Sequence, residues 1–200
     1  MISFHDDVLA ALRDATASRH AVLDQAMPLA RMAPSLSDYR EHLRLLRGWL
    51  ASMMQATLRH RDGPQDRRLL PPVDRLRLID ADLADPALAI DAGGAAATPS
   101  AAELDGNAAW RWGVAYVVEG SQLGGVVLYR RLVASLAPHP LRYLHGDGVP
   151  PGPRWQLFLA RLRAEVRSPA DIAQACAGAC AAFDALIAQL PPQVPQAEAA

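Results

Sequence analysis

The sequence of 200 residues contains no lysine, so arginine supplies all 20 of its basic side chains. With 21 acidic residues the formal net charge is −1, and the two signs are mixed along the chain. No basic stripe or common DNA- or RNA-binding motif is present, which argues against a nucleic-acid-binding protein. Any anion that the protein binds has to be contacted by arginine, whose planar fork pairs well with carboxylates.

Cysteine is also scarce. Cys176 and Cys180 lie one helical turn apart in an alanine-rich stretch. Two cysteines are too few for a disulfide framework or a four-cysteine zinc site. We interpret them as small core residues in a reducing compartment.

Signals for export or membrane insertion are lacking as well. Asp6 and Asp7 stand where a signal peptide would be basic, and no uninterrupted apolar run is long enough to span a bilayer. We therefore expect a cytoplasmic protein without a membrane partner.

The sequence is rich in residues that favour helices. Hydrophobic residues make up 51% of the chain, and clusters of β-branched residues are few. A capping box at Ser100 and Glu103 predicts one helix start, and Ser168 predicts another. Apolar residues recur at helical spacing in several segments. The predicted helices cover residues 4–27, 37–60, 73–83, 100–120, 122–136, 155–166 and 169–190.

These helices predict an all-α, single-domain, multi-helical bundle over residues 1–190, followed by a flexible C-terminal tail over 191–200. The first helix is expected to begin after a cap at Ser3 and to end at Pro28. We find no internal repeat and no convincing strand.

The most informative segment is 116–128, which reads YVVEGSQLGGVVL. It places three glycines within six residues of a strongly helical stretch, and each costs about 1 kcal/mol relative to alanine in a helix interior. Gly120 and Gly124 are four residues apart and share one face of a helix. Without a Cβ on that face, a planar macrocycle could lie directly against the backbone. A tight helix–helix crossing, or a loop between two helices, is the structural alternative.

His20 is the histidine with the most suggestive neighbours. Asp24 follows one turn later on the same face, where it could fix the tautomer of a metal-binding imidazole. Arg13 lies about 10 Å earlier along the helix axis and could bind a carboxylate. An ordinary His–Asp pair on an amphipathic helix is the alternative. His42 is the rival ligand, although Glu41 and Arg44 beside it suggest a solvated face.

Together these two segments resemble the haem oxygenase family. Residues 12–20, LRDATASRH, are similar to the helix that carries the axial ligand, with Thr16 four residues before His20. Residues 116–125, YVVEGSQLGG, are similar to the distal helix, especially that of bacterial members associated with bacteriophytochromes. The spacing of about a hundred residues between the two segments also agrees.

The resemblance implies a role for each matching residue. His20 would be the iron ligand and Asp24 its hydrogen-bond partner. Arg13 and Tyr116 would contact haem propionates. The remaining positions would line the haem or take part in the reaction: Thr16, Gly120, Ser121, Gly124, Gly125 and Phe183.

One position departs from the animal enzymes, which carry an aspartate directly after the first distal glycine. Here that position is Ser121. Proton delivery would therefore use backbone carbonyls and water, with Ser121 or Gln122 as side-chain partners.

The resemblance further implies an oxidoreductase that opens haem b, both cofactor and substrate, to biliverdin, carbon monoxide and iron with O2. The chain carries no nucleotide fingerprint, so a ferredoxin or flavin reductase would supply electrons. A phytochrome could receive the biliverdin. Three alternatives stay open: a haem carrier or sensor, a non-haem protein of the same architecture (thiamin-degrading or di-iron), and a pure interaction bundle.

Overall fold

The computed structural model describes residues 7–88, 105–146 and 150–191. These residues are helical with no strand among them, which confirms the predicted all-α class. The α-helices and the short 3-10 helices (η) are, in chain order, α1 Val8–Ala26, η1 Pro28–Ala30, α2 Leu36–Thr57, η2 Gly63–Gln65, α3 Leu76–Leu83, η3 Pro86–Leu88, α4 Ala108–Leu132, α5 Arg142–His145, α6 Pro151–Glu165 and α7 Pro169–Ile187. The tail expected from 191 onward lies, except for Pro191, outside the described residues.

Side-chain caps determine where most of the long helices start. Asp7 caps α1, so this helix begins at Val8 and later than predicted; Ser3 lies outside the described residues. Ser35 and Asp38 form a capping box at the start of α2. Ser168 caps α7 as predicted. In each case an oxygen accepts a backbone N–H that the first turn leaves without a partner.

The prediction for α4 was wrong in two respects. The helix begins behind the Asn107 cap, and the predicted capping box at Ser100 and Glu103 lies outside the described residues. It also runs without interruption to Leu132, where two helices separated near Ser121 were expected. Glycine lowers helix propensity but keeps its backbone N–H, so helical hydrogen bonding continues through it, whereas proline would remove a donor.

The other differences are smaller and lie mainly at helix ends. The structure adds α5 within a connection that the sequence suggested was irregular, and α6 starts at Pro151 rather than Trp155. Proline is well suited to a first helical turn because its missing N–H has no partner to lose there. The proline-rich start was therefore part of the helix.

The backbones of α4 and α7 pack in direct contact. A Cβ added at Gly113 would overlap the carbonyl oxygen of Ala175, and one added at Gly178 would overlap that of Trp110. The tight crossing that we considered for the later glycines of α4 therefore occurs at this earlier pair. It fixes the first half of α4 against α7.

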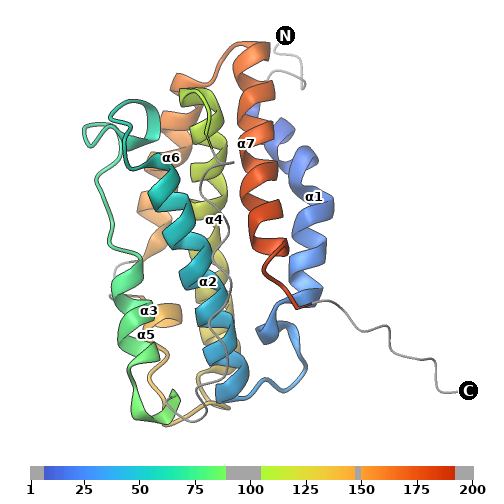
Figure 1. The fold of residues 1–200 in the computed structure, drawn as a ribbon, viewed down its shortest axis with the longest axis vertical. Coiled ribbons are helices and arrows are strands. Elements are labelled where there is room, and N and C mark those ends of the chain that lie inside the picture. Colours follow the sequence, from blue (N-terminus) through green and yellow to red (C-terminus); the bar gives the residue numbers. More distant parts are fainter. Residues whose placement is uncertain (1–6, 89–104, 147–149, 192–200) are drawn as a thin grey trace, which may run out of the picture.

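Two other helices pack around α4 and α7: α1 lies against the other side of α7, and α2 contacts both α7 and α4 (Figure 1). By length and composition α7 is apolar enough to cross a membrane, which the sequence prediction did not anticipate. Its buried side chains include the small residues Ala175, Ala179 and Ala182. The packing of this face against α1 and α4 accounts for the composition of α7.

Candidate functional site

A cavity of about 660 Å³ lies between α1, α2 and the second half of α4. This volume is in the range of sites that hold a drug-sized or larger organic ligand. Of the site residues selected from the sequence, Arg13 alone does not line the cavity. The others do: Thr16, His20, Asp24, Tyr116, Gly120, Ser121, Gly124, Gly125 and Phe183.

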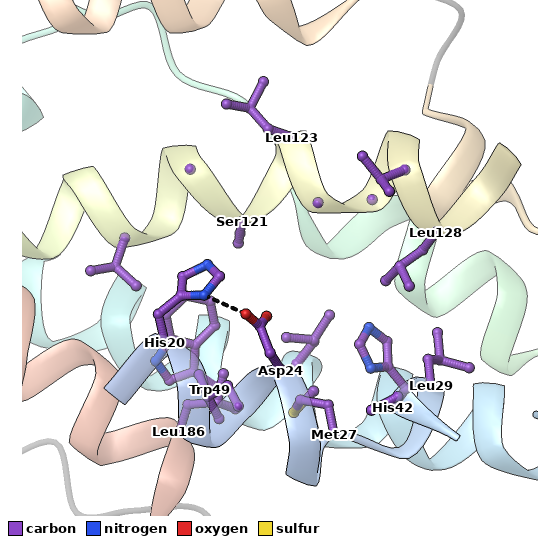
Figure 2. Close-up of a pocket in the computed structure, with 18 of the residues that line it drawn as sticks. His20, Asp24, Met27, Leu29, His42, Trp49, Ser121, Leu123, Leu128 and Leu186 are labelled. Atoms are coloured by element: carbon purple, nitrogen blue, oxygen red, sulfur yellow. Dashed lines mark hydrogen bonds and ion pairs between the residues drawn. The ribbon is translucent and has the colours of Figure 1, made fainter. Parts of the chain in front are cut away.

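His20 and Asp24 occupy the α1 side of this cavity (Figure 2). Nδ1 of His20 lies 2.8 Å from Oδ2 of Asp24, one helical turn away. The His20 side chain is 63% exposed, so its second nitrogen, Nε2, is not enclosed by protein atoms. Phe183 from α7 packs near the imidazole, with ring centroids 6.0 Å apart. With Nδ1 donating to the carboxylate, Nε2 is the nitrogen left to bind a metal.

A contact between side chains joins α1 to α4 at one end of the cavity. The Tyr116 hydroxyl hydrogen-bonds with Arg13, which explains how Arg13 belongs to the site without lining it. Burial raises the pKa of Tyr116, and the nearby guanidinium only partly opposes this effect. The phenol is therefore neutral at ordinary pH, and the positive charge at this end belongs to Arg13. Thr16, between Arg13 and His20, is buried and donates to the carbonyl of Leu12 at 2.7 Å.

The glycines of α4 form the opposite wall of the cavity. A Cβ added at Gly124 would meet nothing within 4 Å. A Cβ added at Gly120 would meet only the ring of Trp155, at 3.7 Å. A Cβ at Gly125 would lie 3.9 Å from the carbonyl oxygen of Leu144. These glycines do not serve helix packing as Gly113 does. Their missing side chains leave the backbone itself facing the open space.

A short chain of polar groups continues from this wall. Ser121 donates to the Val118 carbonyl at 2.8 Å and accepts from the Gln122 amide at 3.2 Å. The same amide lies 3.2 Å from the hydroxyl of Tyr143, which also lines the cavity. Sequence reasoning missed Tyr143 because the connection in which it lies was assigned no element.

Glu119, directly before Gly120, is held in a buried ion cluster. Arg154 of α6 binds it through two hydrogen bonds of 2.8 and 2.7 Å, and Arg75 lies 2.6 Å away. Burial raises the pKa of the carboxyl, but the two guanidiniums outweigh this and hold the pKa below its usual value. The cluster attaches the start of the glycine segment to α6 and to the residues before α3.

The prediction that His42 lies on a solvated face was wrong. Its side chain is buried, with 6% of the residue exposed, and it lines the cavity from α2. Burial lowers its pKa to about 4, so the imidazole is neutral at ordinary pH. Spacing could have revealed this, because His42 follows Tyr39 by three residues and precedes Leu46 by four, on the apolar face of the helix.

The comparisons with known proteins agree with this geometry. The family model described as "Heme oxygenase" matches residues 6–190. The chain belongs to the haem oxygenase family. It is also 37% identical over 156 residues to a heme oxygenase of Xanthomonas campestris pv. campestris (strain 8004), covering 72% of this chain and 81% of that protein. The resemblance found in the two motifs is thereby confirmed for the family.

The residues of this haem oxygenase family member fit a haem. On the α1 side of the cavity, His20 has one nitrogen that the hydrogen bond to Asp24 leaves free, and on the α4 side the glycines present bare helix backbone. Among the described residues, no group of three or more His, Cys, Asp or Glu side chains could hold a metal ion. This argues against the di-iron alternative, which needs several carboxylates on facing helices. A haem needs only one protein ligand because its porphyrin supplies the others.

Proposed function

We propose that the protein is a haem oxygenase that opens haem b to biliverdin, carbon monoxide and iron, using O2 and an external electron donor. The observation that carries the proposal is the cavity itself, which His20 lines from α1 and the glycines Gly120 and Gly124 line from α4. Bound haem supplies the iron at which O2 is activated and the ring that is cleaved. The protein's part is to hold this substrate, orient it and control the water around it.

On the α1 side, His20 would bind the iron through Nε2. Asp24 keeps the ring oriented and raises the basicity of that nitrogen. Arg13 with the neutral Tyr116 would hold the propionates, because an arginine fork pairs with a carboxylate and a phenol can donate to it. These contacts would fix both the height and the direction of the porphyrin.

On the α4 side, Gly120 and Gly124 would leave room for the ring to approach the helix backbone. Ser121, Gln122 and Tyr143 provide polar atoms next to it. We propose that these groups hold the water that delivers protons, in the place of the aspartate found in animal enzymes. A neutral network can do this because hydroxyls and amides both donate and accept.

A haem carrier or sensor is the second candidate, and Ser121 is the observation that favours it. Its hydroxyl donates to the carbonyl of Val118, so it presents an acceptor rather than a proton to the cavity. Such a protein would bind haem and O2 without cleaving the ring.

A single-turnover experiment separates the two candidates. The haem complex is given O2 and electrons from a ferredoxin or a flavin reductase, and the products are identified by chromatography. Loss of the Soret band with formation of a biliverdin isomer is expected. A stable oxygenated complex would favour the carrier, and failure to bind haem would contradict both candidates.

Two finer proposals concern the setting of the reaction. We propose that it takes place in the cytoplasm, where reduced ferredoxin or flavin is available, and that a phytochrome receives the product. Cell fractionation tests the first. Transfer of biliverdin to an apo-phytochrome tests the second: appearance of its red absorption band is expected, and no band above a biliverdin-only control would contradict it.

A further inference from the structure

The inference concerns His42 and rests on the proposed function. His42 is a buried imidazole whose Nδ1 has no hydrogen-bond partner among the described residues. Native proteins rarely leave a buried polar atom without a partner, because its lost hydration is not repaid. A leucine or phenylalanine would fill the same space without this cost. The buried Nδ1 has no room for a ligand, so its lack of a partner bears on which nitrogen carries the proton; the other nitrogen, Nε2, is not among the buried unpartnered atoms and is the one that a ligand can reach.

The direction of the ring narrows the search for a partner of Nε2. Figure 2 shows the His42 ring extending from α2 toward α4, near Leu29 and Leu128. In an imidazole Nδ1 lies beside the Cβ and Nε2 lies at the tip. A buried N–H without a partner is rarer than an acceptor without one, so Nδ1 is best left unprotonated. The proton then resides on Nε2, which makes the tip of the ring a hydrogen-bond donor toward the cavity.

The position of His42 along the cavity determines which part of a ligand it meets. Arg13 and Tyr116 join α1 to α4 at one end. At the other end, Arg131 of α4 donates to the carbonyl of Leu29 in η1. Figure 2 shows His42 beside Leu29, on the far side of Asp24 from His20. Arg13 precedes His20 on α1, so it belongs to the opposite end of the cavity. A haem whose propionates are held by Arg13 would turn its opposite edge toward His42.

That edge of haem carries methyl, vinyl and meso carbon groups, none of which accepts a strong hydrogen bond. Opening the ring at the meso carbon of this edge changes its chemistry, because each of the two pyrroles beside the lost carbon becomes a lactam with a carbonyl oxygen. We propose that Nε2–H of His42 donates to a lactam carbonyl of the ring-opened product, so that His42 recognises biliverdin and not haem. His42 is then a positioning residue for product, and it has no part in holding the substrate.

The test measures binding of the two ligands separately and needs no turnover. Trp49 and Trp155 line the cavity, so quenching of tryptophan fluorescence reports occupancy by haem or by biliverdin. In His42→Phe, we expect haem affinity within about threefold of wild type and biliverdin affinity about tenfold weaker, the effect of one neutral hydrogen bond. His42→Gln, whose amide can donate, should recover part of the loss. His60→Phe, outside the cavity, is the control and should bind both ligands as wild type does.

A spectroscopic readout accompanies the titrations. A hydrogen bond to a lactam lowers its carbonyl stretching frequency, so the infrared band of bound biliverdin should rise in His42→Phe. Unchanged biliverdin affinity in this variant would overturn the inference, as would an equal loss for both ligands, which would indicate packing alone. A wild-type protein that does not bind haem would contradict the proposed function instead.

Discussion

Asp24 lies 2.8 Å from Nδ1 of His20 and one turn along the same helix, so the two residues form a preoriented pair on α1. The pair needs no contribution from the rest of the fold, because residues four apart on a helix are neighbours. The fold adds the cavity next to this pair, in which a ligand can reach Nε2 of His20.

Replacing His20 with alanine should remove the protein ligand of the iron. We expect the Soret and visible bands of a histidine-bound haem to be absent after reconstitution, and haem affinity to fall. His60→Ala, a histidine away from the cavity, is the matched control and should reconstitute normally. An unchanged spectrum in His20→Ala would disprove the ligand assignment.

Replacing Asp24 with asparagine should leave the protein folded, because both side chains of the pair are largely exposed. An amide is a weaker acceptor than a carboxylate, so the imidazole becomes a poorer donor to iron. We expect haem affinity to fall by about 10- to 100-fold, the usual effect of losing such a partner. Stopped-flow dissociation to an apo-globin acceptor measures this, and a dissociation rate equal to that of wild type would count against the pair.

Two glycines of α4 allow a paired test, because Gly124 borders the cavity and Gly113 packs against α7. Gly124→Leu places its side chain where a Cβ meets nothing within 4 Å, so the free protein should be as stable as wild type or slightly more stable. The same side chain should obstruct a planar ligand and abolish tight haem binding. Thermal unfolding and haem titration report the two effects, and normal haem affinity would contradict the proposed position of the ring.

Gly113→Ala, in the same helix, should instead destabilise the free protein. Its Cβ would overlap the carbonyl oxygen of Ala175, so α4 and α7 would have to separate. Overpacking of this kind costs about 1–3 kcal/mol or more. We expect a lower free energy of unfolding in urea. An unaltered denaturation midpoint would show that the crossing is looser than the structure indicates.

His42 should make the stability of the free protein depend on pH. Its native pKa of about 4 lies below the ordinary value of 6.5, so between these values the unfolded chain binds a proton that the native protein does not. The neutral imidazole therefore contributes fully to the free energy of unfolding above about pH 6.5. This contribution, about 3 kcal/mol in total, is lost as the pH falls toward 4. Urea unfolding of wild type and His42→Phe at several pH values measures it.

The difference between the two proteins isolates the contribution of His42, because wild type and His42→Phe share every other ionisable side chain. As the pH falls, wild type should lose more free energy of unfolding than His42→Phe does. A difference that stays constant from pH 7 to pH 4 would mean that His42 is hydrated in the native protein.

Local sequence determined which parts of the fold and site could be predicted. The His20–Asp24 pair and the Ser168 cap involve residues within one turn, so spacing alone identifies them. Helix bounds were less certain near Gly120 and Pro151, because glycine and proline each disfavour a helix on average while particular positions tolerate them. The continuous helix α4 shows that glycines, which keep their backbone N–H groups, need not interrupt a helix.

The missed site residues depend on contacts between distant segments. Tyr143 reaches the cavity only because α5 packs against α4, and no short motif encodes that approach. Likewise, the distinction between Gly113 and Gly124 depends on which helix lies opposite each one. For His42, by contrast, the apolar spacing of α2 carried the information, and the charged neighbours Glu41 and Arg44 obscured it.

The two kinds of glycine in α4 give a single helix two different surroundings. At Gly113 the backbone lies against that of α7 and has no room to move, whereas at Gly124 it borders empty volume. A flat ligand can therefore reach the helix at Gly124 without displacing a side chain. Amide hydrogen exchange should be slower near Gly113 than near Gly124 in the free protein, and a bound ligand should reduce this contrast.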